Sequence, residues 1–211
     1  MLMHTSMSGP KNVTLPATRS LAFATPLLLI VFALILAGCG KSGNGSAGGI
    51  HVKAPGMDER DIAAKSGATF ASTKSFTDKD NKITTAATYR VYVASYDLDT
   101  SQFARSMDKP MTADDQARVV FSLVGEEGGN EKSPLKAGTY SAKADKYLKI
   151  EEVSIVTRKN GQDNKVVLDR SDLAGEVRVT AVSGDSVSGE LNLTGGETSI
   201  KGPFTAKILM R

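Results

Sequence analysis

The sequence predicts an all-β domain, either an antiparallel β-sandwich or a small β-barrel of about eight strands. Three observations lead to this prediction. Apolar residues recur at every second position in many segments, turn-forming residues separate these segments, and the one long interruption of the pattern lies between residues 97 and 118. Eight or so short strands joined by tight turns are typical of both architectures.

The clearest alternation lies near the carboxyl end of the chain. Two segments there place apolar or small residues at alternate positions, namely Val187, Gly189, Leu191 and Leu193, and then Ile200, Gly202, Phe204, Ala206 and Ile208. We expect two antiparallel strands, with a hairpin at Gly195-Gly196. Because proline cannot donate a ladder hydrogen bond, Pro203 predicts a sheet edge or a bulge. The small residues Gly189, Gly202 and Ala206 indicate close contact between two sheets.

Six further strands are expected upstream of these two. Turns are expected at Asn160-Gly161 and at Ser183-Gly184-Asp185-Ser186, where residues that tolerate positive φ or bond locally to the backbone are concentrated. The six strands cover residues 89–93, 119–123, 138–142, 148–158, 165–169 and 176–182.

The 97–118 connection interrupts the strand pattern, and we expect one or two short helices in it. Thr100 and Thr112 are placed to cap helices over 100–107 and 112–117, with Asp115 completing a capping box. Lys109-Pro110 separates the two. The segment is either a lid that faces a partner or an ordinary connection packed over one end of the domain.

The amino-terminal 38 residues have the profile of a signal peptide. Lys11 and Arg19 precede an apolar run from Leu21 to Leu36, and no acidic residue occurs before that run. Positive charge ahead of an apolar run keeps the amino terminus in the cytoplasm, so the residues that follow are exported. The alternative is an uncleaved transmembrane helix, since residues 21–38 approach the length of about 20 residues that spans a bilayer.

The apolar run ends in Leu36-Ala37-Gly38-Cys39, and Cys39 is the only cysteine in the chain. This motif resembles the lipobox of bacterial lipoproteins. The resemblance implies cleavage before Cys39 and attachment of acyl chains, such as palmitate, to that residue. It further implies anchoring in a lipid bilayer. In the Gram-negative lipoproteins that this chain resembles, Asp after the cysteine retains the protein at the inner membrane, so Gly40 favours the outer membrane.

Three segments are therefore expected: a signal peptide over 1–38, a lipidated cysteine and flexible tether over 39–66, and a β-rich globular domain over 67–211. Residues 40–49 consist mostly of glycine and serine, which favours a flexible coil. Within 58–65 we expect one or two helical turns. With its one cysteine acylated, the domain has no internal disulfide.

Charge and histidine content exclude several classes of partner and of catalytic site. The chain has 26 basic and 23 acidic residues, of which Lys11 and Arg19 leave with the leader, and it has no long basic run. Nucleic acid is therefore not an expected partner. Of the two histidines, His4 leaves with the leader and His51 follows the tether, so Ser-His-Asp, Cys-His and zinc sites are disfavoured. We expect no catalytic residues, no cofactor and no enzyme.

Three short segments partly match the sequence motifs of known functional sites. Gly184-Asp185-Ser186 resembles the segment around the nucleophile of trypsin-like proteases, and Ser133-Pro134-Leu135-Lys136 has the Ser-x-x-Lys spacing of penicillin-binding proteins. Asp97, Asp99 and Ser101 open a weak calcium-loop pattern that lacks the glycine and glutamate such a loop requires. We interpret all three patterns as turns or strand ends.

Paired carboxylates could support glycoside cleavage without histidine. The candidate pairs are Glu126-Glu127 and Glu151-Glu152. Neighbours on a strand point to opposite faces, so neither pair is expected to form one site.

The carboxyl-terminal 75 or so residues are similar in strand and turn pattern to the β-rich domains of bacterial lipoproteins. The export anchor and the missing catalytic machinery lead us to expect a non-enzymatic envelope lipoprotein, an antiparallel β-sandwich that binds a partner protein, peptidoglycan or a small ligand. Two alternatives stay open. One is a lipocalin-like carrier of a small or lipidic ligand, and the other is a histidine-free hydrolase of envelope polymers.

Overall fold

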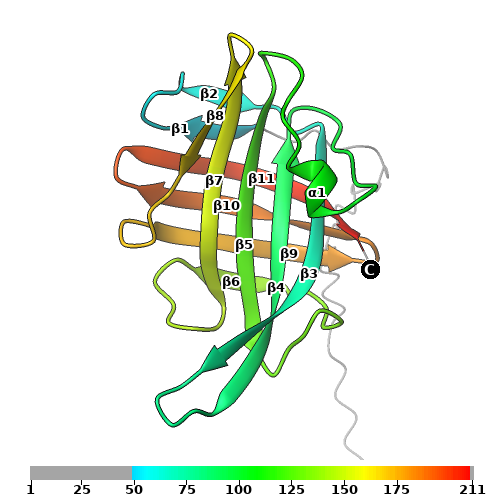
Figure 1. Cartoon of the computed structure of the whole chain (residues 1–211), viewed down its shortest axis with the longest axis vertical. Helices are drawn as coiled ribbons and strands as arrows, with labels where there is room; N and C mark the ends of the chain where they lie inside the picture. The colour runs from blue at the N-terminus through cyan, green and yellow to red at the C-terminus, as the bar shows by residue number, and fades with distance from the viewer. Residues whose placement is uncertain (1–48, 210–211) are drawn as a thin grey trace, which may run out of the picture. The chain divides into compact units, whose positions relative to one another are not determined.

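A computed structural model describes residues 49–209 of the chain. These residues form eleven β-strands and one short helix, which confirms the all-β prediction (Figure 1). The elements are β1 (Ile50–Lys53), β2 (Arg60–Ile62), β3 (Ser66–Thr77), β4 (Ile83–Ala94), α1 (Ala104–Met107), β5 (Ala117–Glu127), β6 (Gly138–Ser141), β7 (Lys149–Lys159), β8 (Gln162–Val167), β9 (Ala174–Ser183), β10 (Ser186–Gly195) and β11 (Thr198–Leu209).

Eight of the strands close into a ring in the order β10-β9-β6-β7-β5-β4-β3-β11, and β11 pairs again with β10. In Figure 1 the long strands β7, β5, β4 and β3 form a front layer, and β9, β10 and β11 cross behind them. The two corners between the layers are parallel pairings, β3 with β11 and β6 with β7. The sheet is therefore mixed, whereas the sequence pattern predicted antiparallel pairing throughout.

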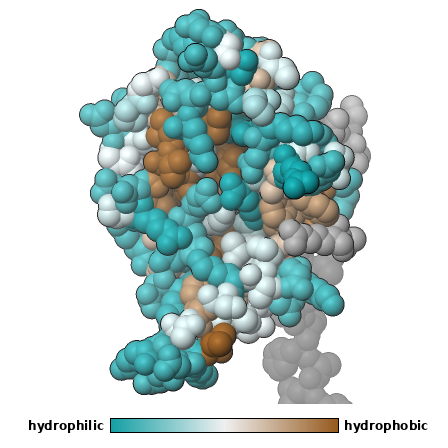
Figure 2. All heavy atoms as spheres, viewed as in Figure 1, coloured by the Kyte–Doolittle hydropathy of each residue, from teal (hydrophilic) through white to brown (hydrophobic). Residues whose placement is uncertain are grey.

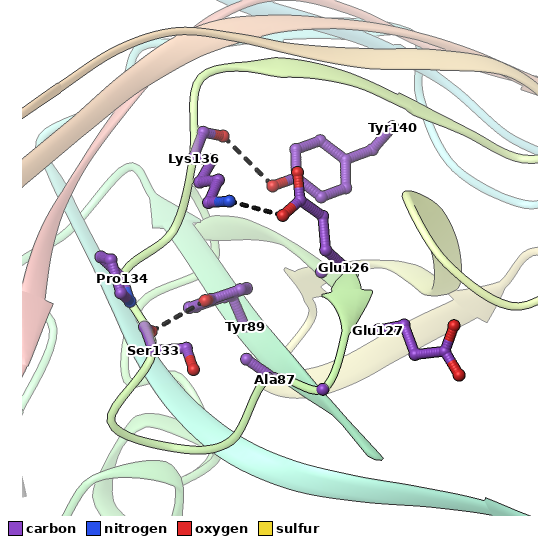
Figure 3. A pocket seen from close by; sticks show the side chains of 11 residues that line it. Ala87, Tyr89, Glu126, Glu127, Ser133, Pro134, Lys136 and Tyr140 are labelled. Carbon is purple, nitrogen blue, oxygen red and sulfur yellow. Dashed lines mark hydrogen bonds and ion pairs between the residues drawn. The ribbon is translucent and has the colours of Figure 1, made fainter. Parts of the chain in front are cut away.

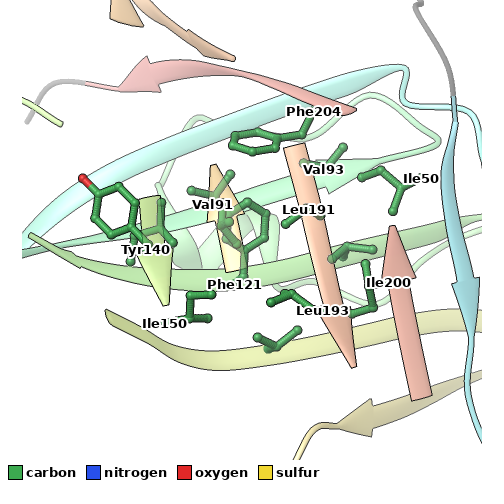
Figure 4. Close-up of a cluster of buried hydrophobic side chains, with 14 of the residues drawn as sticks. Ile50, Val91, Val93, Phe121, Tyr140, Ile150, Leu191, Leu193, Ile200 and Phe204 are labelled. Carbon is green, nitrogen blue, oxygen red and sulfur yellow. The ribbon is translucent and has the colours of Figure 1, made fainter. Parts of the chain in front are cut away.

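One hydrophobic core fills the space between the layers (Figure 4). Phe121 of β5 and Phe204 of β11 meet inside it, and neither is more than 2% exposed. Sandwich and barrel were alternatives in the prediction, and the domain has features of both. Its layers pack face to face as in a sandwich, while its strands close on themselves as in a barrel.

The alternation near the carboxyl end is confirmed in β10 and β11. Val187, Leu191 and Leu193 are buried in the core, and polar residues between them face outward. Pro203 pairs with Glu190 of β10, while on the other side of β11 the pairing with β1 ends at Lys201 and the pairing with β3 begins at Lys207. Pro203 thus occupies a local edge, as predicted.

Glycine is required at two positions of these strands by neighbours in the same sheet, not by the opposite sheet as the sequence indicated. A Cβ at Gly189 would lie 2.3 Å from the carbonyl oxygen of Arg178 and 2.7 Å from the ring of Phe204. A Cβ at Gly202, where φ is +138°, would lie 2.6 Å from the carbonyl oxygen of Gly49. Phe204 lies directly over Gly189, its partner on the adjacent strand.

The hairpin prediction at Asn160-Gly161 is confirmed between β7 and β8. Both residues have positive φ, 52° and 77°, which is the conformation of a two-residue turn matched to the twist of the strands.

The 97–118 connection contains only one short helix, α1. The predicted helix over 112–117 is absent, because the side-chain oxygen of Gln116 accepts hydrogen bonds from the backbone N–H groups of Thr112 and Ala113. Asp115 thus makes no capping box there. The connection covers the outer face of β3, β4 and β5, where a second small core forms from Ala68, Phe70, Tyr92, Met107 and Val120.

Arg118 holds this connection against β5. It is 6% exposed, and its guanidinium donates to the carbonyl oxygens of Met107 at 2.7 Å, Lys109 at 3.0 Å and Asp108 at 3.3 Å. One buried cation thereby supplies hydrogen bonds to three carbonyl groups that have none from a helix or a sheet.

The folded domain begins earlier than the sequence predicted. Residues 50–62, assigned to the tether, form β1 and β2, and Ile50, Val52 and Ile62 are buried in the core. Strand β2 occupies part of the segment in which helical turns were expected. The domain boundary at residue 67 is therefore wrong, and the sheet begins at Ile50.

Candidate functional site

The candidate site lies at one end of the ring, where the segment 128–137, here called the end strap, passes between β5 and β6. Leu135 of the end strap is 5% exposed and belongs to the core. Two buried tyrosines hold the strap from inside the ring. The Tyr89 hydroxyl donates to the carbonyl oxygen of Ser133 at 2.8 Å, and the Tyr140 hydroxyl donates to that of Lys136 at 3.1 Å.

On one side of the strap lies a pocket of about 250 Å³, here called the tyrosine pocket (Figure 3). Glu126 on β5 forms an ion pair with Lys136 across it. Burial raises the pKa of Tyr140 to about 12, and burial together with the nearby Tyr140 raises that of Tyr89 further. Both phenols therefore stay protonated at neutral pH and act as hydrogen-bond donors to the strap.

A larger cavity of about 800 Å³, here called the edge groove, also borders the strap and shares Tyr89, Ser133 and Pro134 with the tyrosine pocket. Its walls come from β3, from the strap, from the β9–β10 turn and from the end of β11. The apolar side chains among its lining residues are Phe70, Ala71, Tyr89, Pro134, Leu135, Val182, Ile208 and Leu209. The groove has the size and the mainly apolar walls of a small-molecule or peptide site, a class that spans roughly 300–1,000 Å³.

One wall of the edge groove is a strand edge. Strand β3 pairs with β4 along all twelve of its residues, but with β11 only at Ala68, Thr69 and Phe70. Among the described residues, which end at 209, the pairing with β11 ends at Phe70, and β3 continues to Thr77. The strap touches this stretch through Thr73, whose hydroxyl contacts the Glu131 carboxylate and accepts a hydrogen bond from the Glu131 N–H.

The Ser-x-x-Lys residues Ser133 and Lys136 both line the tyrosine pocket, but their polar groups have other partners. The Ser133 hydroxyl accepts a hydrogen bond from the backbone N–H of Asn130, and the Lys136 ammonium is paired with Glu126. The segment is not helical. It therefore lacks the helix start on which the chemistry of that motif depends.

The Gly184-Asp185-Ser186 sequence lies in the β9–β10 hairpin, as predicted. Ser186 donates to the carbonyl oxygen of Ser183 at 3.1 Å. The one histidine among the described residues, His51, lies on β1, and its ring nitrogens form hydrogen bonds with the carboxylates of Asp61 and Glu59.

Of the calcium-loop residues, Ser101 donates hydrogen bonds to Asp99, and Asp97 and Asp99 each pair with a lysine. Asp97 forms an ion pair with Lys65 at 2.8 Å, and Asp99 forms one with Lys109 at 3.0 Å. Hydrogen bonds from Ser101 and Lys109 lower the pKa of Asp99 to about 2. Within residues 49–209, no group of three or more His, Cys, Asp and Glu side chains is arranged to hold a metal.

The pair Glu151-Glu152 departs from strand alternation. Phe121 pairs with Val153 and Leu123 with Ile150, so β7 has one extra residue in a bulge at this pair. Ile150 and Val153 both enter the core, and both glutamates lie between them outside it. Glu151 pairs with Lys74 and Arg170, and Glu152 pairs with Arg90.

These ion pairs tie β7 to β3 and β4 on the outer face of the front layer. Figure 2 shows that this face is mostly hydrophilic, with apolar side chains visible over the long strands. The charged side chains that surround the two carboxylates give them a structural role.

Neither the tyrosine pocket nor the edge groove is predicted by the sequence pattern. Tyr89 was assigned to a strand and Tyr140 to another, but nothing in their spacing showed that both reach the same loop. Residues 66–77, which supply the open edge, contain no Val, Ile or Leu and were not identified as a strand.

The lipobox residues Leu36, Ala37, Gly38 and Cys39 lie outside the described residues. In the part that the structure describes, no helix has the length and hydrophobicity needed to cross a membrane. Comparison with known proteins returned no matching family model, no matching curated protein and no matching solved structure.

Proposed function

We propose that this chain is an exported lipoprotein of the bacterial cell envelope whose β domain is a non-enzymatic binding module. The observation that carries the proposal is the sequence Leu36-Ala37-Gly38-Cys39, which directly follows a leader with basic residues and an apolar run. Two or three acyl chains on Cys39 would attach the domain durably to the bilayer, because one chain alone gives only marginal binding.

The edge groove supports the binding role of the domain. It is the larger of the two cavities at the strap end, its walls are mainly apolar, and they come from four separate parts of the fold. The candidate catalytic groups lie elsewhere or are paired, as described above for Lys136 and Glu151. A partner protein, peptidoglycan or a small ligand would contact the domain in this groove.

A lipocalin-like carrier of a small or lipidic ligand is the second candidate, and the volume of the edge groove favours it. Such a ligand would not occupy the middle of the ring, because Phe121 and Phe204 fill that space. It would bind beside β3 and the end strap instead.

Metabolic labelling with radioactive palmitate tests the anchor. The wild-type chain should incorporate label and fractionate with membranes, and Cys39→Ser should do neither. In a Gram-negative host, Gly40→Asp is the matched variant, because it keeps Cys39 while changing the sorting residue. It should move the labelled protein from the outer to the inner membrane.

Full-length, unlabelled protein in the cytosol of the wild-type strain would overturn the proposal. Equal labelling of the wild type and Cys39→Ser would do the same.

A further inference from the structure

Among residues 49–209, the part of β3 that follows Phe70 has a strand partner on one side only. Ala71–Thr77 pairs with β4 on one side, and no described strand lies on the other side. In a strand, alternate N–H and C=O groups point to each edge, so this stretch presents a row of backbone donors and acceptors on its free side. Of these residues, Ala71, Ser72 and Thr73 line the edge groove.

The end strap contacts this edge at Thr73, but the edge has no proline, bulge or unpaired charge to protect it. Residues 71–77 contain no proline, and their register with β4 is unbroken. Their only charged residue, Lys74, is paired with Glu151 of β7. Edges without proline, bulges or free charges are templates for a further strand.

The groove beside the edge provides space for apolar side chains. Ala71, Val182 and Ile208 pack against the core and line the groove, together with buried Leu135. An added strand would point every second side chain toward these residues. The free backbone groups and the apolar groove therefore specify the same occupant, an extended chain with alternating apolar side chains.

A second copy of this chain fits the groove less well. If two β3 edges paired, the side chains of each strand on the groove side would be those of Ala71, Thr73 and Ser75, none of which is large and apolar. They would leave a cavity of about 800 Å³ largely unfilled.

We propose that an extended, alternately apolar peptide segment of another protein binds as an added strand along Ala71–Thr77, with its apolar side chains in the edge groove. The added strand lies on the side of β3 that β11 occupies as far as Leu209, the last described residue. Strand addition of this kind draws affinity from the main chain and specificity from pockets for alternate side chains. This inference rests on the proposed binding role of the domain and names its ligand class.

The test uses the full chain, expressed with its leader and purified into nanodiscs. The probe is a display library of random eight-residue peptides, and the selected peptides are resynthesised with scrambled controls. We expect the selected sequences to alternate apolar with polar residues. Hydrogen exchange should show fast-exchanging amides within 71–77 in the free protein, and these should become protected when a selected peptide binds.

Backbone methylation separates strand addition from binding through side chains alone. Methylating the amides of residues 2, 4 and 6 of a selected peptide removes the donors on one edge, and methylating residues 3, 5 and 7 removes those on the other. One pattern should weaken binding by about tenfold or more, because two or three hydrogen bonds are lost, and the other should have little effect. Equal tolerance of both patterns would overturn the proposal.

Ala71→Trp fills the groove, and exposed Ala181, which precedes Val182 on β9, gives the matched control Ala181→Trp. The first variant should abolish peptide binding, and the second should retain it. A library that enriches no peptide on the wild type over Ala71→Trp would contradict strand addition.

Two further outcomes would each overturn this inference while leaving the proposed binding role intact. One is saturable binding of a fluorescent fatty acid that Ala71→Trp blocks, without any peptide binding. The other is self-association that the same substitution abolishes. Failure of the palmitate labelling would instead overturn the anchor, whatever the peptides show.

Discussion

The rings of Phe121 and Phe204 meet edge to face in the middle of the domain, with their centroids 5.2 Å apart and their planes at 79°. The two residues belong to opposite layers, on β5 and β11, so their contact joins the layers directly. Phe204 also lies over Gly189 of the adjacent strand. The Phe204 side chain on β11 therefore contacts both β5 of the opposite layer and the adjacent strand β10.

Truncating Phe204 to alanine should lower the free energy of unfolding by about 3–5 kcal/mol, because a fully buried aromatic side chain is replaced by a cavity. Phe121→Ala should cost a similar amount. A double-mutant cycle measured by urea denaturation should give a coupling of about 0.5–1.5 kcal/mol for the aromatic pair. Additive losses would show that the two rings pack independently.

Substituting Gly189 by alanine should destabilise the domain by about 1–3 kcal/mol, the usual cost of adding atoms to a packed interior. The new methyl group would meet the Arg178 carbonyl oxygen at 2.3 Å and the Phe204 ring at 2.7 Å. Gly195→Ala is the control, because its nearest neighbour outside the adjoining residues is a Leu168 methyl group at 3.4 Å. Equal unfolding midpoints for the two variants would contradict the contact at Gly189.

His51 should titrate above its usual pKa of 6.5. Hydrogen bonds to Asp61 at 2.9 Å and to Glu59 at 3.0 Å favour the charged imidazolium and raise the pKa of His51. Since the folded pKa is the higher one, this cluster stabilises the β1–β2 pair fully below pH 6.5. The contribution is lost as the pH rises through the folded pKa.

An NMR titration of the His51 ring checks this directly, because the other histidine, His4, lies in the predicted leader. Asp61→Asn should move the midpoint down toward 6.5, and Glu59→Gln should move it less. A wild-type midpoint at or below 6.5 would refute the assignment.

Replacing Arg118 by lysine should loosen the 97–118 connection, while the ring of eight strands stays closed. An ammonium group cannot reproduce the planar fork that donates to three carbonyl oxygens at once, and each unpaired buried group costs about 1–3 kcal/mol. Hydrogen exchange of residues 104–108 should accelerate relative to β5. Arg105 of α1 is exposed, so the control Arg105→Lys should leave these rates unchanged.

Alternation in the sequence was sufficient to place β10 and β11, because Val187, Leu191 and Phe204 are large enough to mark the buried face. It failed for β3, whose Ala, Ser and Thr residues do not distinguish the two faces. Alternation also misassigned Glu151 and Glu152. A bulge adds one residue to β7 without any local composition that reveals it.

The candidate site was less predictable than the fold for a related reason. Tyr89 and Ser133 are 44 residues apart in the chain, and their hydrogen bond exists only because ring closure places the end strap over β4. The edge groove likewise has walls from β3, the end strap, the β9–β10 turn and β11, which are distant in the chain. Both features follow from the way distant segments come together, which a single sequence does not encode in any local pattern.

Strand β11 contacts β10, β1 and β3, so the last described strand completes three pairings at once. When the chain emerges in order from a ribosome or a secretion channel, the sheet stays open until residues 198–209 have emerged. We therefore expect the domain to close only after residues 198–209 have emerged, and to close slowly, since distant segments must meet before the core forms. Such a delay would suit a protein that has to cross a membrane in an extended state.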